Sequence, residues 1–141
     1  MSEVGTKYLL ARVTVPIAEC LDEFADRLTQ LIPGFTFRPE ITGRFEEVPA
    51  CVAEQNGMEF VLFGVPEDEL VDEYEVKFKC ETNLPLEVLL AQDTGGFVRR
   101  FVGKKPVDER GFLDCSQDLA QLLVECGISG CKPIVPGGQS S

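Results

Sequence analysis

The sequence predicts an α+β fold, in which two helices pack on one mostly antiparallel or mixed sheet of about five to six strands. Three features predict this fold. Residues 7–15 and 74–81 alternate between apolar and polar side chains, as strands with one buried face do. Residues 17–32 and 115–126 instead carry apolar side chains three and four positions apart, which is typical of amphipathic helices. Asn56-Gly57 is a strong hairpin-turn signal.

The first two elements are a strand and a helix. Pro16 is expected to end the strand at residues 7–15, because proline cannot donate to a sheet ladder. The helix at residues 17–32 is expected to end at Pro33-Gly34, a pair that does not continue a helix. Acidic residues follow the helical spacing on the side opposite the apolar stripe, so we expect that side to face solvent.

A hairpin centred on Asn56-Gly57 is expected to follow the first helix. Pro49 weakens its first strand, or places that strand at a sheet edge or a bulge. The second strand, at residues 58–65, is apolar on both faces apart from Glu59, which suits a central strand. The alternating strand at residues 74–81 comes next, with one buried and one solvent-facing side.

Residues 84–92 fit two structures. Asn83 followed by Pro85 would start a short helix, whereas the alternating leucine and valine side chains would line a strand. The sequence DTGG at residues 93–96 has hairpin chemistry, and residues 97–102 have a strand-like composition. We therefore favour a second hairpin here.

The last predicted element is the second helix. Asp114 or Ser116 can cap its start, and Gly127 is well placed to end it. The predicted order of elements is therefore strand, helix, five strands and helix, or β-α-β-β-β-β-β-α. We expect a single globular domain over residues 1–135 and a flexible tail over residues 136–141, which are polar and rich in glycine.

Charge is unevenly distributed along the chain. The 141 residues carry a net charge of −11, and residues 19–75 hold 15 acidic side chains against three basic ones, a net of −12. Residues 1–18 contribute +1 and residues 76–141 contribute zero, which recovers −11. We therefore expect no direct binding to nucleic acid or to a membrane, because phosphate and anionic lipid are both bound by basic surfaces.

Two segments hold much of this excess. Six of the nine residues from 67 to 75 are acidic, and the first helix carries acids on its solvent-facing side. Acidic pairs four residues apart on a helix cost about 0.2–0.5 kcal/mol each. The pattern indicates either an ordinary solvated surface or a surface for a basic partner, and the second is our hypothesis. The predicted partner-binding residues are Glu19, Asp22, Glu23, Asp26, Glu67, Asp68, Glu69, Asp72, Glu73 and Glu75.

Composition excludes several kinds of active site. The chain has no histidine, so it contains no Cys-His or Ser-His-Asp site and no zinc site with imidazole ligands. It has no paired C-x-x-C spacing, no EF-hand spacing in the acidic run and no phosphate-binding loop. We therefore expect no catalytic residues, no metal site and no cofactor, although an active site built from carboxylates stays open.

The six cysteines fit a reducing compartment. Four of them fall on predicted apolar faces, namely Cys51, Cys80, Cys115 and Cys126. We expect free thiols that pack as small apolar groups. Only Cys131 has a cationic neighbour in sequence, which is the context of a reactive thiol. We find no secretory signal and no apolar run long enough to span a bilayer, so we expect a cytoplasmic protein; whether a signal peptide has been removed stays open.

These features favour a non-catalytic inhibitor or immunity-type protein, of the kind that bacteria use against toxins. It would bind and neutralise one basic protein, such as a nuclease or another nucleic-acid-handling toxin, through its acidic surface. One alternative is a small carboxylate-based enzyme or small-molecule-binding domain, which needs an apolar pocket holding an acid. A second alternative is an adaptor or structural module that dimerises through an unpaired strand edge. The sequence leaves the partner, the oligomeric state and the sheet order open.

Overall fold

The computed structural model describes residues 6–41, 48–65, 72–102 and 107–134. Within these ranges the chain forms an α+β fold with one mixed sheet, as predicted. The predicted tail lies outside them. The elements are β1 (Lys7–Pro16), α1 (Leu21–Leu31), β2 (Arg38–Pro39), β3 (Ala50–Gln55), β4 (Met58–Phe63), β5 (Glu73–Thr82), α2 (Leu86–Ala91), α3 (Val98–Phe101), β6 (Phe112–Asp114), α4 (Ser116–Glu125) and β7 (Lys132–Pro133).

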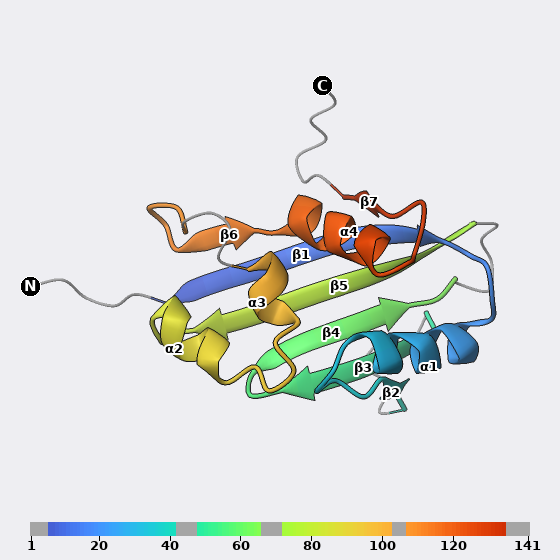
Figure 1. Ribbon diagram of the computed structural model, residues 1–141, viewed down its shortest axis with the longest axis horizontal. Helices are drawn as coiled ribbons and strands as arrows, with labels where there is room; N and C mark the ends of the chain where they lie inside the picture. The colour runs from blue at the N-terminus through green and yellow to red at the C-terminus, as the bar shows by residue number, and fades with distance from the viewer. Residues whose placement is uncertain (1–5, 42–47, 66–71, 103–106, 135–141) are drawn as a thin grey trace, which may run out of the picture.

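The sheet is built around the long pair of strands β1 and β5 (Figure 1). Its order is β2-β3-β4-β5-β1-β6, and β7 pairs with a part of β1 that β6 does not reach. Neighbouring strands are antiparallel except for β1 and β6, which are parallel. The β1–β5 ladder spans ten residues of each strand, from Lys7 opposite Thr82 to Pro16 opposite Glu73.

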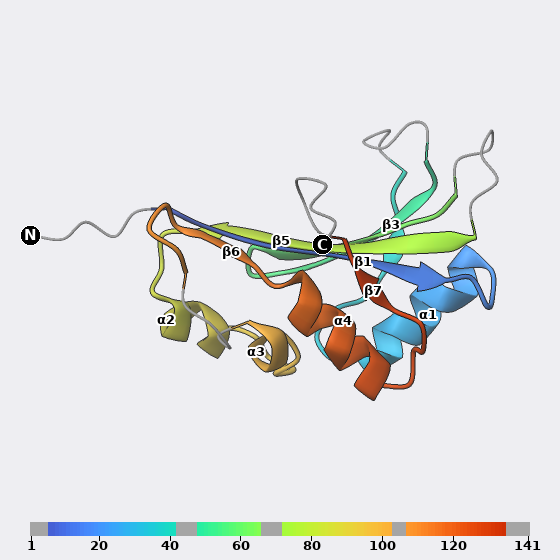
Figure 2. The same cartoon turned by 90° about the horizontal axis from the view of Figure 1, so that it is seen from above.

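The helices α1 to α4 all lie on one face of the sheet, as Figure 2 shows. Because side chains alternate along a strand, every second residue of β1 and β5 points toward these helices and is buried. This confirms the alternation that the sequence shows. We name the other side of the sheet the open face. The residues that point toward the helices are Leu9, Ala11, Val13, Val15, Tyr74, Val76, Phe78 and Cys80.

The core is centred on Phe60 of β4, which is fully buried. Its ring lies 4.9 to 6.2 Å, between centroids, from five other phenylalanine rings. Each such aromatic pair contributes about 0.5–1.5 kcal/mol beyond the area it buries. The sheet, α3 and the segment after α1 therefore share one aromatic cluster. The five partner rings belong to Phe35, Phe37, Phe78, Phe97 and Phe101.

The second hairpin, predicted over residues 84–102, is wrong, because this segment forms α2 and α3. The carboxylate of Asp93 accepts a hydrogen bond from the backbone N–H of Val98 (2.7 Å) and so caps α3. Gly95 fits closely against Pro33, since a Cβ at Gly95 would lie 2.2 Å from the Pro33 carbonyl oxygen. The DTGG segment therefore packs against the loop after α1. With α2 and α3, the described part of the chain has four helices, where the sequence predicted two.

The other predicted elements are present. The first predicted helix is α1, which begins at Leu21 instead of residue 17, and the second is α4. The β3–β4 turn has φ of 51° at Asn56 and 85° at Gly57, as a type I′ hairpin turn requires. The strands β2, β6 and β7, of two or three residues each, were not predicted, so the order after β5 is corrected to α2, α3, β6, α4 and β7. None of the described helices is long and apolar enough to cross a membrane.

Three segments close the outer edge of β1. The strand β6 pairs with its first half, and β7 pairs with its second half. Between them, the backbone N–H of Arg12 donates a hydrogen bond to Oγ of Ser116, at 2.9 Å. Ser116 stands at the start of α4 and is only 5 % exposed. The Ser116 hydroxyl therefore supplies the hydrogen-bond acceptor that the backbone N–H of Arg12 does not find on a neighbouring strand.

The Ser116→Ala substitution should lower the free energy of unfolding by about 1–3 kcal/mol, because the Arg12 N–H then loses its acceptor in a poorly hydrated place. Urea unfolding followed by circular dichroism measures this change. The matched control is Gln117→Ala at the next, exposed position, which should change stability by less than about 0.5 kcal/mol. Equal stability of the Ser116→Ala variant and the parent would contradict this role.

Candidate functional site

Two acidic segments meet at one end of the molecule. The backbone N–H of Ile17, before α1, donates to the carbonyl oxygen of Asp72, before β5, at 3.1 Å. The Tyr74 hydroxyl donates to the carbonyl oxygen of Glu19, 55 residues away in sequence, at 3.0 Å, and the Tyr74 ring stacks on Phe24. The start of α1 therefore lies beside the start of β5. We name this region the acidic end, and its described carboxylates are Glu19, Asp22, Glu23, Asp26, Asp72, Glu73 and Glu75.

These seven residues belong to the ten that the sequence predicts to bind a partner. The remaining three lie outside the described residues, and they are Glu67, Asp68 and Glu69. The fold thus brings together, at one end, acidic side chains from two segments that are far apart in the chain. Whether a partner binds them stays a prediction.

The sheet divides the acidic end between two faces. The helix α1 lies on the helix-covered face, and its acidic side chains are exposed there. Tyr74 points toward the helices, so its neighbours Glu73 and Glu75 point to the open face. The acidic end is therefore a surface that wraps around the end of the sheet rather than one flat patch.

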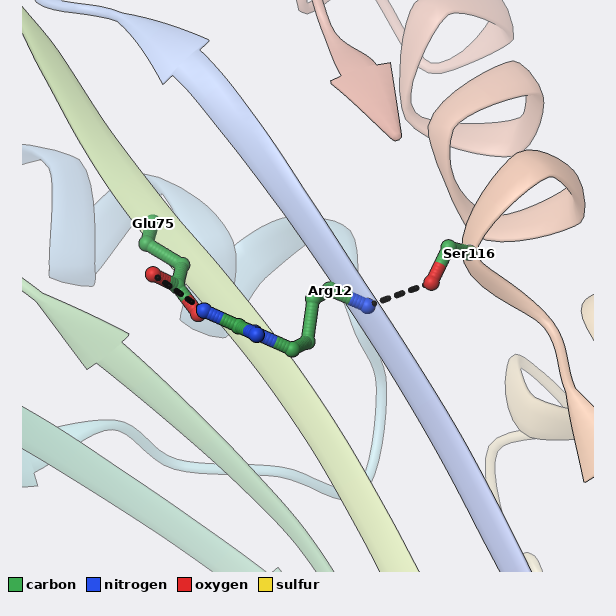
Figure 3. A network of polar contacts seen from close by, with 3 residues as sticks. All are labelled: Arg12, Glu75 and Ser116. Atoms are coloured by element: carbon green, nitrogen blue, oxygen red, sulfur yellow. Dashed lines mark hydrogen bonds and ion pairs between the residues drawn. The ribbon is translucent and has the colours of Figure 1, made fainter. Parts of the chain in front are cut away.

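Two carboxylates of the acidic end are bound to arginine. Oε2 of Glu75 lies 2.9 Å from Nε of Arg12 on the open face (Figure 3). Oε1 of Glu19 lies 3.3 Å from Nη1 of Arg27. The hydrogen bond to Glu75 raises the pKa of Arg12. All four side chains are partly exposed, so each pair contributes at most about 1 kcal/mol to stability.

The other five carboxylates of the acidic end form no ion pair within the described ranges, and they are Asp22, Glu23, Asp26, Asp72 and Glu73. Burial raises the pKa of the Cys51 thiol, and the nearby carboxylates of Asp22 and Asp26 raise it further. The electrostatic field of these two carboxylates therefore acts on Cys51, a residue of β3. No group of three or more Cys, Asp or Glu side chains in the described part of the chain converges as metal ligands would. The arrangement can attract and bind cationic side chains.

A groove of about 400 Å³ hollows the open face beside the acidic end. Phe63 and the paired side chains Arg12 and Glu75 line it, together with Glu73 and Lys77. Its two acids and two bases give no net charge. The groove therefore shows no preference for a ligand of one charge, in contrast to the acidic end as a whole.

All six cysteines are unbridged. Cys20 is exposed; Cys51, Cys80 and Cys115 are buried, as the apolar pattern predicts; Cys126 and Cys131 are half-buried. Burial raises the pKa of Cys131 to about 11, although Arg27 acts in the opposite direction. Its Sγ donates a hydrogen bond to the carbonyl oxygen of Ile128 at 3.2 Å. Burial therefore outweighs the cationic neighbours of Cys131, which disfavours a reactive thiol at this position.

Sequence reasoning overlooked the open face. The solvent-facing side of β1 carries Tyr8, Leu10 and Arg12, and Tyr8 lies beside Phe112 of β6. An aromatic and an aliphatic side chain on the outer side of an alternating strand is a signal that the sequence does contain. The prediction of a strand with one buried face rests on its inward-facing side chains, so these outward-facing residues do not enter it.

Comparison with models of known protein families finds no match for this chain, and neither does comparison with curated proteins or with solved structures. Function is therefore inferred from the residues of this chain and their arrangement.

Brief treatment of the native protein with iodoacetamide at about pH 8 should modify Cys20 first, because the thiolate is the reactive form and Cys20 is exposed. Cys80 and Cys131 should resist, since burial raises the pKa of each to about 11. Peptide mass spectrometry measures the extent of reaction. After unfolding without reductant, all six thiols should react. Fewer than four reactive thiols in fresh protein, or equal native rates for Cys131 and Cys20, would contradict this assignment.

Proposed function

We propose that this chain is a non-catalytic acidic protein that binds and neutralises a basic protein, as a cytoplasmic inhibitor or bacterial immunity protein does. A nuclease or another nucleic-acid-handling toxin is the partner that fits best, because enzymes that act on nucleic acid carry basic clefts. The observation that carries the proposal is the meeting of the two acidic segments, through the Ile17–Asp72 and Tyr74–Glu19 hydrogen bonds.

The charge balance at the acidic end supports this proposal. Arg12 and Arg27 neutralise Glu75 and Glu19, which leaves five carboxylates without a cation in the described part of the chain. Four of these five are exposed, and Glu73 is half-buried. Repulsion among these like charges slightly raises the free energy of the unbound protein. Binding of a partner's cationic side chains would relieve that repulsion. The protein as a whole, at −11, adds a long-range field of the same sign.

Such a surface acts mainly on the rate of association. Exposed charges steer the encounter between partners, whereas desolvated pairs at the centre of an interface set the rate of dissociation. Because the acidic end wraps around the end of the sheet, a partner's basic cleft could receive it as a convex edge. Salt should therefore slow association, since the screening length is about 8 Å at physiological ionic strength.

Reversing three charges of the acidic end, with Asp22→Lys, Glu23→Lys and Asp72→Lys together, should slow association by about tenfold or more at low salt. The dependence of the rate on salt should also become shallower. The partner in this test is the purified product of the gene beside that for this chain. Stopped-flow or surface-binding kinetics at two salt concentrations measure both effects.

The matched control reverses three exposed acids elsewhere, with Glu87→Lys, Glu109→Lys and Glu125→Lys, and so changes the net charge equally. It should slow association far less, and thermal melts should show that both triple variants fold. Equal rates for the two triple variants would show that net charge alone matters and not the acidic end. Failure of the neighbouring product to bind the parent protein would contradict the immunity-type assignment.

A further inference from the structure

A second hollow lies on the open face, at the opposite end of β5 from the acidic end. Its volume is about 500 Å³, and it extends from the β3–β4 hairpin across the end of β5 and the start of β1 to the strand β6. The register places Tyr8 between Phe112 of β6 on one side and Glu81 of β5 on the other. Neighbouring strands lie about 4.8 Å apart, so these three side chains stand next to one another on the same face.

Two aromatic rings form the apolar part of this hollow. Tyr8 is 46 % exposed and Phe112 is 36 % exposed, which is unusual for adjacent large side chains in a sheet. Leu10, half-buried, adds an aliphatic floor between them and the middle of the sheet. The rings are therefore accessible to a ligand that enters from solvent.

The residues that line the hollow carry a net negative charge. Three carboxylates and one ammonium line the hollow, a net of −2, and they belong to Glu54, Glu59, Glu81 and Lys79. The carboxylate of Glu54 accepts a hydrogen bond from the backbone N–H of Gly57 at 2.9 Å. The carboxylate of Glu81 is exposed and forms no ion pair or side-chain hydrogen bond with any other described residue. A cationic group is therefore the ligand whose charge complements this hollow. Among the carboxylates that line it, that of Glu81 lies nearest to Tyr8.

We infer that this hollow binds the guanidinium group of an arginine side chain from a protein partner. The faces of aromatic rings attract cations, and a planar guanidinium can lie flat on a ring while its N–H groups reach a carboxylate. The ammonium of lysine is compact and strongly hydrated, so it gains less from the rings. Lys79 also lines the hollow and repels the incoming cation. The inference goes beyond the proposed function, because it uses no carboxylate of the acidic end.

The probe for this site is N-acetylarginine amide, titrated into the isotope-labelled full chain and followed by two-dimensional NMR. The amide signals of Tyr8, Glu81 and Phe112 should shift and saturate. The matched control ligand is N-acetylcitrulline amide, which has the same shape without the charge, and it should cause no saturable shift. N-acetyllysine amide with a free ε-amine should bind more weakly than the arginine probe.

Substitutions should change the affinity for the arginine probe in both directions. Glu81→Gln and Tyr8→Leu should each weaken it about twofold to fivefold, since one removes the carboxylate and the other removes the ring. Tyr8→Phe keeps the ring and should bind like the parent. Lys79→Gln removes a repelling charge and should strengthen binding about twofold. The same spectra report whether each variant keeps its fold.

The triple charge reversal at the acidic end, measured at about 0.15 M salt, should leave this titration unchanged, because screening separates two sites at opposite ends of β5. A loss of partner association in that variant with an unchanged arginine titration would distinguish the two sites. Equal shifts with the citrulline probe, or weaker binding after Lys79→Gln, would overturn the inference. So would saturable shifts that avoid Tyr8 and Glu81.

Discussion

The antiparallel pairing of β1 with β5 is the interaction on which the rest of this structure depends. It runs without a break over ten residues of each strand. Because side chains alternate with a period of two, its register decides which of them face the helices, and a slip by one residue would turn the apolar set of β1 to solvent. The strand β4 extends this pair on one side, and β6, Ser116 and β7 complete it on the other.

The same pairing assembles the two candidate binding surfaces. At the end where Pro16 meets Glu73, it places the start of α1 beside the start of β5 and so gathers the acidic end. At the other end, it places Tyr8 beside Glu81, where β6 adds Phe112. Neither surface uses a side chain of the aromatic core. Substitutions that alter binding at either end can therefore leave the packing around the core unchanged.

The sequence predicts an element well where its pattern is complete within one segment, as in β1, β5, α1, α4 and the β3–β4 hairpin. Over residues 84–102 the favoured hairpin is wrong, whereas the alternative of a short helix after Pro85 matches α2. The hydrogen bond from Val98 to Asp93 and the fit of Gly95 against the loop after α1 fix the structure around α3, and the second of these is a contact between distant segments. Charge counting located the acids of the acidic end, but it could not show that the sheet divides them between two faces. Tyr8 and Phe112 become neighbours only through a strand of three residues, too short to leave a pattern.

The central claim is that the helix-facing side of β5 stabilises the fold, whereas the side chains on its open face contribute little to stability. Alanine substitution along the strand, with the free energy of unfolding measured in urea, tests it most directly. Val76→Ala and Phe78→Ala should each cost about 2–5 kcal/mol, because both side chains are fully buried. Lys77→Ala and Lys79→Ala should each cost less than about 1 kcal/mol. Losses that alternate along β5 support the account, whereas similar losses at all four positions would contradict it.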